Sequence, residues 1–197
     1  MDYSLLTNIA MGIALSACAG FRVFIPMLAG ALAGHFGVVD LPEDMVWLSG
    51  WPAILLFGTA AVAEVVAYYI PFVDNLLDTI ATPLSIGAGT VLAASILPLG
   101  DNEPLRWAVG LLAGGSAAGT IQLGTGLLRL FSSKATIGTG NAVVSTSENA
   151  AALSGSVLSF FMPVIIALLL LLLIGWILVK VGRRIARRNA KPGRMGF

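Results

Sequence analysis

The chain has 197 residues, of which 57% are hydrophobic and only 11% are charged, and its mean hydropathy is +0.93. This composition excludes an ordinary soluble globular domain, whose surface needs many more charged side chains, and it is typical of an integral membrane protein. The formal net charge is +1, but seven of the eleven Lys and Arg residues lie in the last eighteen positions.

The first apolar run covers residues 4–36. As one straight helix it would be about 50 Å long, against a hydrocarbon core of about 30 Å, so it must tilt, protrude or break. The segment GFRVFIP predicts a break, because Pro26 lacks a backbone donor and would clash with the carbonyl of Arg22. Small residues four positions apart, a spacing typical of close helix contacts in lipid, occur throughout the run: Gly12, Ser16 and Gly20, then Gly30 and Gly34.

Three further spans are expected at 52–70, 74–98 and 107–131. The connection 37–50 carries three acidic residues and no basic one, which suits an extracytoplasmic loop. The third span contains Pro83, and the fourth contains a GxxxG spacing at Gly115 and Gly119.

Residues 132–151 are rich in Ser, Thr, Gly and Asn. They are either a plain connecting loop or a re-entrant segment lining a polar cavity, where protein or water would satisfy the backbone. The last apolar run, 150–181, is again too long for one perpendicular span, and Pro163 offers a break. The sequence therefore predicts an all-α transmembrane bundle of five spans, or six if the chain turns at Pro163.

The basic C-terminus favours a cytoplasmic location by the positive-inside rule, so five spans would place the N-terminus outside and six would place it inside. We expect residues 1–182 to form the membrane domain and 183–197 to form a basic tail. A basic cluster directly after an apolar span is more typical of an anchor on anionic lipid than of nucleic-acid binding.

Two segments resemble each other, SACAGFRVFIP at 16–26 and GSAAGTIQLGTG at 115–126, and carboxylate–amide pairs follow at Asp74-Asn75 and Glu148-Asn149. This pattern is typical of a duplicated transporter-like unit. The spacings differ and the second span lacks a counterpart, so the sequence leaves the reality of the repeat open.

Four stretches in chain order, AGFRVFIPML, WPAILLFG, YYIPFVDNLLDTIATP and ATIGTGNAVVSTSEN, resemble the small bacterial membrane proteins grouped as domain of unknown function 4126. The resemblance covers residues 5–181, nearly the whole chain. It implies a polytopic inner-membrane protein, and it implies no activity and no residue roles.

Ionisable side chains inside or beside the predicted spans are the best guide to function, because charge in a hydrocarbon core is costly. One cation, Arg22, faces four acids: Glu64, Asp74, Asp78 and Glu148. We expect Arg22 to pair with Glu64 or Asp78, and the remaining acids to be protonated, to face water or to bind a cation. Asp74 and Asp78 are four positions apart, so a helix would place both carboxylates on one face.

Several of these residues also have a purely structural interpretation. Asp74 can cap a helix, and Ser145-Thr-Ser-Glu148 fits a capping box. Gln122 in the fourth span is more typical of an interhelical hydrogen bond than of a ligand contact. Arg22 can be a simple packing counter-ion.

Glu64 is the strongest candidate for a protonatable site. It lies thirteen residues after Trp51, deep in the second span, where no loop backbone is expected within its reach for capping. Its carboxylate therefore needs a side-chain partner, a proton or water.

The sequence contains no His or Cys cluster, phosphate-binding loop or nucleophile motif, so we expect neither an enzyme nor a cofactor. The favoured interpretation is a small transporter or channel with a carboxylate-lined cavity for a small ion, proton or small molecule. The alternatives are an accessory membrane protein that acts through helix contacts, including self-association, and a lipid-handling protein in which Arg22 meets a phosphate head group.

Overall fold

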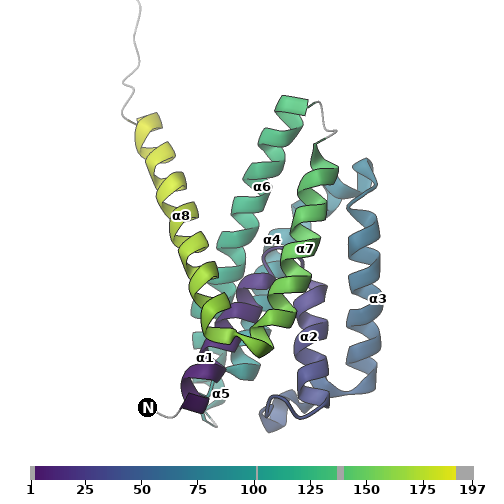
Figure 1. Ribbon diagram of the computed structural model, residues 1–197, viewed down its shortest axis with the longest axis vertical. Coiled ribbons are helices and arrows are strands. Elements are labelled where there is room, and N and C mark those ends of the chain that lie inside the picture. Colours follow the sequence, from purple (N-terminus) through teal and green to yellow (C-terminus); the bar gives the residue numbers. More distant parts are fainter. Residues whose placement is uncertain (1–2, 101, 137–139, 190–197) are drawn as a thin grey trace, which may run out of the picture.

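The computed structural model describes residues 3–100, 102–136 and 140–189, apart from the side chains of 3–4, 71–72, 74–76, 78, 134–135 and 185–189. These residues form helices and connections with no strand, which confirms the all-α class (Figure 1). In chain order the elements are α1 (Tyr3–Cys18), α2 (Phe24–His35), the 3-10 helix η1 (Glu43–Ser49), α3 (Trp51–Ala67), α4 (Pro71–Ile96), α5 (Glu103–Val109), the π-helical η2 (Gly110–Gly115), α6 (Ser116–Thr136), α7 (Asn141–Phe161) and α8 (Pro163–Asn189).

Local sequence signals set many of the helix ends. Prolines occupy the first turn of α3, α4, α5 and α8, where the missing backbone donor costs nothing. Helix α2 ends in a Schellman motif, with Val38 N donating to Ala33 O at 2.8 Å and Gly37 N donating to Gly34 O at 3.2 Å. Gly37 has a φ of 68°, which glycine adopts without strain.

Helices α1 and α2 form a hairpin that returns to the end from which it started (Figure 1). Ser16 Oγ donates to Gly89 O at 3.0 Å, and a Cβ at Gly30 would lie 2.7 Å from Leu92, so both helices run along the same turns of α4. The break predicted at 20–26 is confirmed, with residues 19–23 outside the two helices. The chain does more than kink there, because it reverses direction, and Pro26 lies in the first turn of α2.

Helix α4 packs against η2 and α6 with backbone touching backbone. A Cβ at Gly114 would lie 2.1 Å from Gly89 O, and a Cβ at Gly89 would lie 2.5 Å from Gly114 O. A Cβ at Gly20 would likewise lie 2.3 Å from Ala118 O. Of these three glycines, Gly20 belongs to the small residues identified in the sequence, and it makes a close helix contact within the chain as that spacing predicts.

The polar segment 132–151 is helical wherever it is described, except at Gly140, because α6 continues to Thr136 and α7 begins at Asn141. Neither a long loop nor a re-entrant segment is therefore present in these ranges, and 137–139 lie outside the described residues. The break at Pro163 is a turn: α8 runs back along the molecule after α7 (Figure 1).

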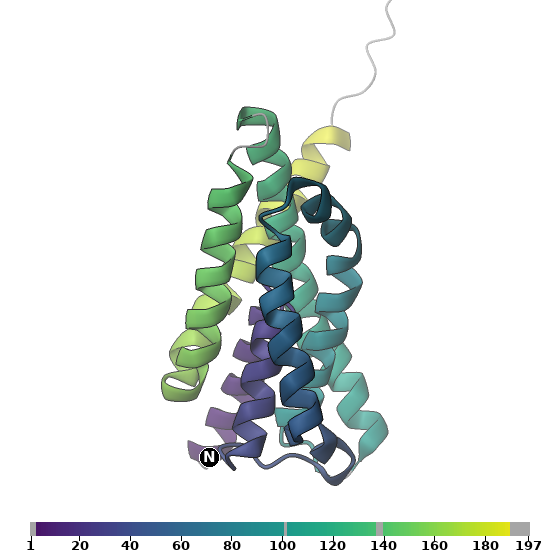
Figure 2. The ribbon, with the colours of Figure 1, turned by 90° about the vertical axis from the view of Figure 1, so that its right-hand side faces the viewer.

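After the hairpin, α3, α4, α5 with α6, α7 and α8 pass alternately along the long axis, and the N-terminus and the end of α8 lie at opposite ends (Figures 1 and 2). By length and composition, two of the described helices are able to cross a membrane, within Thr79–Ile96 and Pro163–Arg184. Helices η1 and α3, which meet at 53°, make a third if they count as one broken span. Five or six spans stay a prediction.

The two segments that resemble each other in sequence differ in structure. Residues 16–26 contain the hairpin break, whereas 115–126 continue from η2 into the uninterrupted α6. Glu148-Asn149 lies inside α7, and Asp74-Asn75 lies near the start of α4. The two segments therefore lie in different local structures, and the repeat that the sequence left open gains no support from this comparison.

Candidate functional site

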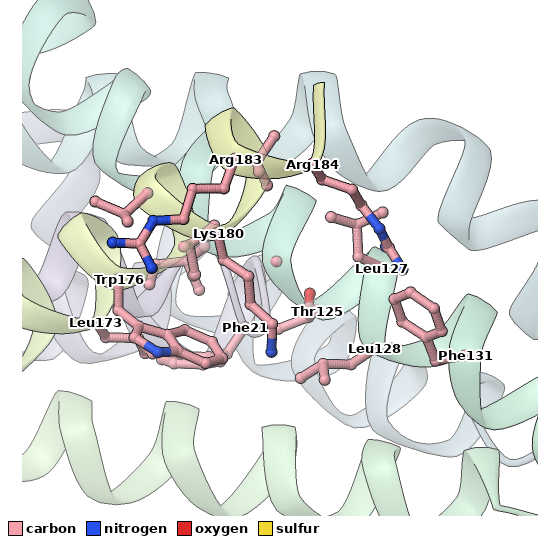
Figure 3. Close-up of a pocket in the computed structure, with 15 residues that line it drawn as sticks. Phe21, Thr125, Leu127, Leu128, Phe131, Leu173, Trp176, Lys180, Arg183 and Arg184 are labelled. Carbon is pink, nitrogen blue, oxygen red and sulfur yellow. The ribbon is translucent and has the colours of Figure 1, made fainter. Parts of the chain in front are cut away.

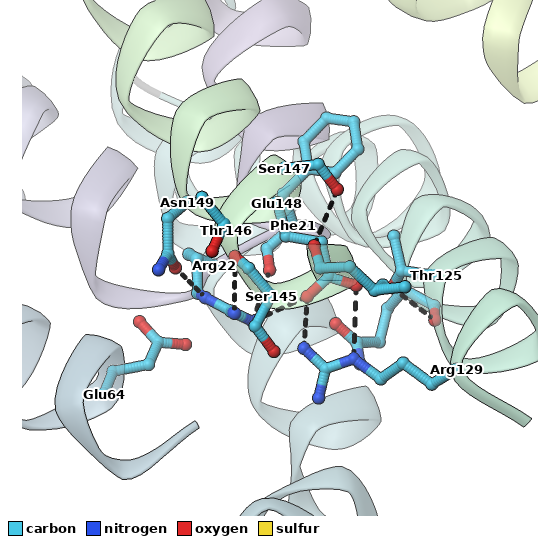
Figure 4. A network of polar contacts seen from close by, with 12 residues as sticks. Phe21, Arg22, Glu64, Thr125, Arg129, Ser145, Thr146, Ser147, Glu148 and Asn149 are labelled. Carbon is cyan, nitrogen blue, oxygen red and sulfur yellow. Dashed lines mark hydrogen bonds and ion pairs between the residues drawn. The ribbon is translucent and has the colours of Figure 1, made fainter. Parts of the chain in front are cut away.

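Arg22 lies at the tip of the α1–α2 hairpin and is 1% exposed. Its guanidinium points toward α7 (Figure 4). Nη1 lies 3.0 Å from Glu148 Oε2, Nε donates to Asn149 Oδ1 at 2.5 Å, and Nη2 donates to Ser145 O at 3.3 Å. The hairpin tip is thus tied to the middle of α7 by a charged side chain and its hydrogen bonds.

Arg129, from α6, contacts the same carboxylate. Its Nε donates to Glu148 Oε1 at 3.2 Å and its Nη2 pairs with Glu148 Oε2, so the guanidinium binds both carboxylate oxygens. Arg129 and Glu148 are each 4% exposed. One buried carboxylate therefore lies between two buried guanidinium groups.

Arg129 was not among the functional residues predicted from the sequence. The prediction counted a single cation among the spans, although Arg129 falls inside the predicted span 107–131. Arg129 lies two residues from the end of that span, and only the packing of α6 against α7 reveals that it is buried.

Tyr68, which follows α3, provides an aromatic contact for both cations. The Cζ atoms of Arg22 and Arg129 lie 3.7 and 4.2 Å from the centroid of its ring. Such contacts are worth most when the cation is desolvated, as it is here. The neighbouring Tyr69 hydroxyl lies 2.9 Å from Thr146 Oγ1 on α7, so the end of α3 is also joined to α7.

Glu64 caps a helix, contrary to the expectation that no backbone would be within its reach. Its Oε1 accepts from Val23 N at 2.9 Å and its Oε2 accepts from Phe24 N at 3.0 Å, at the start of α2. The hairpin break brings these free amides to the depth of Glu64, where a carboxylate is favourable beside a helix N-terminus. Arg22 and Glu64 form no direct ion pair, and the acid bound by Arg22 among the described side chains is Glu148.

Three further residues were predicted to contribute to the site: Gln122, Asp74 and Asp78. Gln122 is buried in α6 and makes no hydrogen bond with the cluster among the described side chains, while its backbone carbonyl accepts from Thr125 Oγ1 at 3.0 Å. Asp74 and Asp78 belong to α4, but their side chains lie outside the described set. The capping box at Ser145 and Glu148 is wrong, because both residues lie inside α7.

Ser145 adds an unused polar group to the cluster. It is 0% exposed, and its hydroxyl has no hydrogen-bond partner in the described part of the chain. A buried hydroxyl without a partner is costly and needs an explanation, and a bound ion or water is one such explanation. Figure 4 shows Ser145 beside Arg22 and Glu148.

A small cavity of about 230 Å³ lies next to the cluster, between the start of α2, α3 and α4. Glu64 and Tyr68 line it together with apolar residues, and Arg22 is not among the lining residues. The described side chains contain no group of three His, Cys, Asp or Glu residues that could hold a metal ion. The cluster offers donors for an anionic group, namely the guanidinium fork of Arg129, Nη1 of Arg22 and the hydroxyl of Ser145.

Fold and cluster together define an all-helical protein with apolar helices long enough to cross a membrane and a buried ion network at the tip of a helical hairpin. The model of the family described as Domain of unknown function (DUF4126) matches residues 9–183. The chain belongs to this family, as the sequence resemblance predicted. No curated protein and no solved structure matches the chain.

Proposed function

We propose that the protein is a small transporter or channel for a carboxylate-like oxyanion, and that the anion binds where the Glu148 carboxylate lies. The observation that carries this proposal is the double coordination of one buried carboxylate by Arg22 and Arg129. When no anion is bound, the carboxylate of Glu148 occupies the proposed anion site.

The geometry favours an oxyanion over a spherical anion. Arg129 binds both oxygens of Glu148, from Nε and Nη2, which is the fork arrangement that matches planar carboxylates. The unpaired Ser145 hydroxyl supplies a further donor. Formate, acetate, bicarbonate and nitrate share this planar shape.

Exchange requires the Glu148 side chain to leave the site. Loss of the Glu148 carboxylate removes the ion pair of the buried Arg22 and one contact of Arg129, which is costly, so an incoming oxyanion would replace the departing carboxylate. A proton on Glu148 would weaken its hold on both cations and would link movement of the anion to pH. Among the described side chains, the charged and titratable groups around Glu148 are Arg22, Arg129, Glu64 and, through its ring, Tyr68.

Two alternatives receive less support. An accessory protein acting through small-residue faces needs those faces to be free, yet Gly20, Gly89 and Gly114 are packed inside the chain. A lipid phosphate at Arg22 would need space for the glycerol and acyl chains that it carries, beside a guanidinium that is 1% exposed, whereas a small oxyanion needs only the space of the Glu148 carboxylate. We also propose binding and movement of the anion without catalysis, because the sequence contains no His or Cys cluster and no nucleophile motif.

We place the protein in the bacterial inner membrane with its C-terminus in the cytoplasm. The support comes from the apolar helix α8 and from the seven basic residues at its end and beyond it. In this orientation the α1–α2 hairpin starts and ends on the periplasmic side, and its tip points toward the cytoplasmic side.

The experiment that tests the proposal is flux of formate, acetate, nitrate and chloride into protein-containing vesicles, with and without a pH gradient. We expect the oxyanions to cross faster than in protein-free vesicles, and Glu148→Gln to remove the dependence on the gradient. Glu103→Gln, an exposed carboxylate on α5, is the matched control and should behave as the parent protein. Oxyanion rates equal to those of empty vesicles would overturn the proposal.

A stability measurement separates this site from a purely structural ion triad. In either case Glu148→Ala should destabilise the fold by about 3–5 kcal/mol, because it removes the buried carboxylate that Arg22 and Arg129 both contact and empties the space that this carboxylate fills. If the site binds oxyanions, formate or acetate should restore most of the lost thermal stability, and chloride at the same ionic strength should not. Equal effects of formate and chloride would identify a structural tie.

A further inference from the structure

A second cavity, separate from the ion cluster, lies between α6 and α8 (Figure 3). Its volume is about 810 Å³. Phe21, Leu128, Leu173 and Ile177 are among the apolar side chains that line it, and Lys180, Arg183 and Arg184 line it from the last turns of the apolar part of α8.

The lining of this cavity consists of apolar side chains along its body and of basic side chains at one end. Three cations and no carboxylate belong to it, and none of the three forms an ion pair with a described carboxylate. Arg184 reaches across to α6, with its Cζ 4.3 Å from the centroid of Phe131, while Lys180 Nζ lies 4.2 Å from the centroid of Trp176 on its own helix. The cavity therefore joins an apolar body to a basic end.

We propose that this cavity binds one anionic phospholipid, with an acyl chain between α6 and α8 and the phosphate on Lys180, Arg183 and Arg184. Helix α8 is apolar from Pro163 and only 11% of its membrane-length window is buried, so its other faces are free to contact lipid. The cations lie in the last five residues of that window, at the level of the head groups, and Trp176 lies one turn earlier, where interfacial aromatic residues are common.

The charges favour a lipid over a second copy of the chain. A symmetric contact through this cavity would bring two sets of the same three cations together, which is unfavourable. Exposed carboxylates that could compensate, such as Asp40, Glu43 and Glu103, belong to the connection before η1, to η1 and to α5, at the opposite end of the molecule (Figure 1). An anionic phospholipid supplies both the apolar chain and the negative charge, and this proposal does not depend on the proposed transport function.

The test is lipid binding to the detergent-solubilised full-length chain, measured by native mass spectrometry and by thermal shift. Dioleoyl phosphatidylglycerol and dioleoyl phosphatidylcholine are compared, together with glycerophosphoglycerol, which has the head group without acyl chains. We expect retention of phosphatidylglycerol, weak retention of phosphatidylcholine and no binding of glycerophosphoglycerol. Replacing Lys180, Arg183 and Arg184 by Gln should weaken phosphatidylglycerol binding by roughly tenfold or more.

Two further variants make the result specific. Replacing Arg188, Lys191 and Arg194 by Gln removes the same charge from the tail and should leave binding within roughly threefold of the parent. Leu173→Trp narrows the cavity without changing the charge and should also weaken binding. Equal losses in the two charge variants, or equal retention of the two phospholipids, would overturn the proposal.

Discussion

The two buried glutamates, Glu64 and Glu148, have different structural roles because they contact different groups. Glu148 lies between Arg22 and Arg129, and its negative charge offsets part of the cost of burying these two cations. Glu64 is equally enclosed, yet its oxygens accept from the backbone amides of Val23 and Phe24. At the scale of the residue, the local partners therefore decide whether a carboxylate is an ion-pair partner or a helix cap.

Glu64→Gln tests the capping role. The amide keeps one acceptor oxygen but turns an NH₂ group toward a backbone donor, so one buried N–H loses its partner. We expect a loss of about 1–3 kcal/mol in unfolding free energy, or several degrees in thermal midpoint, measured in detergent. Glu43→Gln, at an exposed position in η1, should change stability by less than about 0.5 kcal/mol.

The same variant also tests Glu64 as a proton site. A cap whose carboxylate stays bound to two amides does not take part in pH-linked flux, so the pH response of Glu64→Gln should match that of the parent. A variant with unchanged stability and no pH response would contradict the capping role and restore Glu64 as the protonatable group.

Close backbone contact is the main feature at the scale of the elements. Gly89 on α4 and Gly114 on η2 bring the two helices so near that neither position has room for a Cβ. The π-helical η2 lies at this contact, where α5 passes into α6. The contact holds α4 beside the helix that carries Arg129.

Gly114→Ala should destabilise the protein by about 1–3 kcal/mol or more, because its Cβ would lie 2.1 Å from a backbone oxygen that cannot move away alone. Gly126→Ala in α6 is the matched control, because a Cβ there meets no atom within 4 Å. It should stabilise the helix by about 0.5–1 kcal/mol. Thermal midpoints of the two variants in the same detergent should therefore shift in opposite directions, and similar shifts would refute the packing argument.

At the scale of the whole molecule, the α1–α2 hairpin determines at which end of the long axis each later helix begins. The hairpin begins and ends at one end of the molecule, and the following helices then pass alternately to the other end, where α8 finishes (Figures 1 and 2). The ion cluster lies at the hairpin tip, where α3, α6 and α7 all contribute side chains.

Labelling of single cysteines tests this path. In a Cys18→Ala background, which removes the sole native cysteine, cysteines at positions 2, 38 and 194 are treated with a membrane-impermeant maleimide in vesicles of known orientation. We expect positions 2 and 38 to react from the periplasmic side and position 194 from the cytoplasmic side. A single continuous span from residue 4 to 36 would place positions 2 and 38 on opposite sides, and periplasmic labelling at 194 would overturn the orientation.

The sequence by itself determined the all-α class, the family, and the two places where long apolar runs stop being helical, near Pro26 and at Pro163. These features follow from local chemistry, since a proline or a helix cap acts within one turn. The lengths of the apolar runs were also informative, because a helix has a fixed rise per residue.

Only the tertiary structure decided the reversal at Arg22, the partner of that guanidinium and the role of Glu64. Arg22 and Asn149 are 127 residues apart, and no spacing rule connects positions in different helices. Helix periodicity gives the face on which a side chain lies, but the neighbour of that face depends on how all the helices pack. The partner of each buried charge is therefore set by the contacts among the α1–α2 hairpin, α3, α6 and α7, and not by any local segment of the chain.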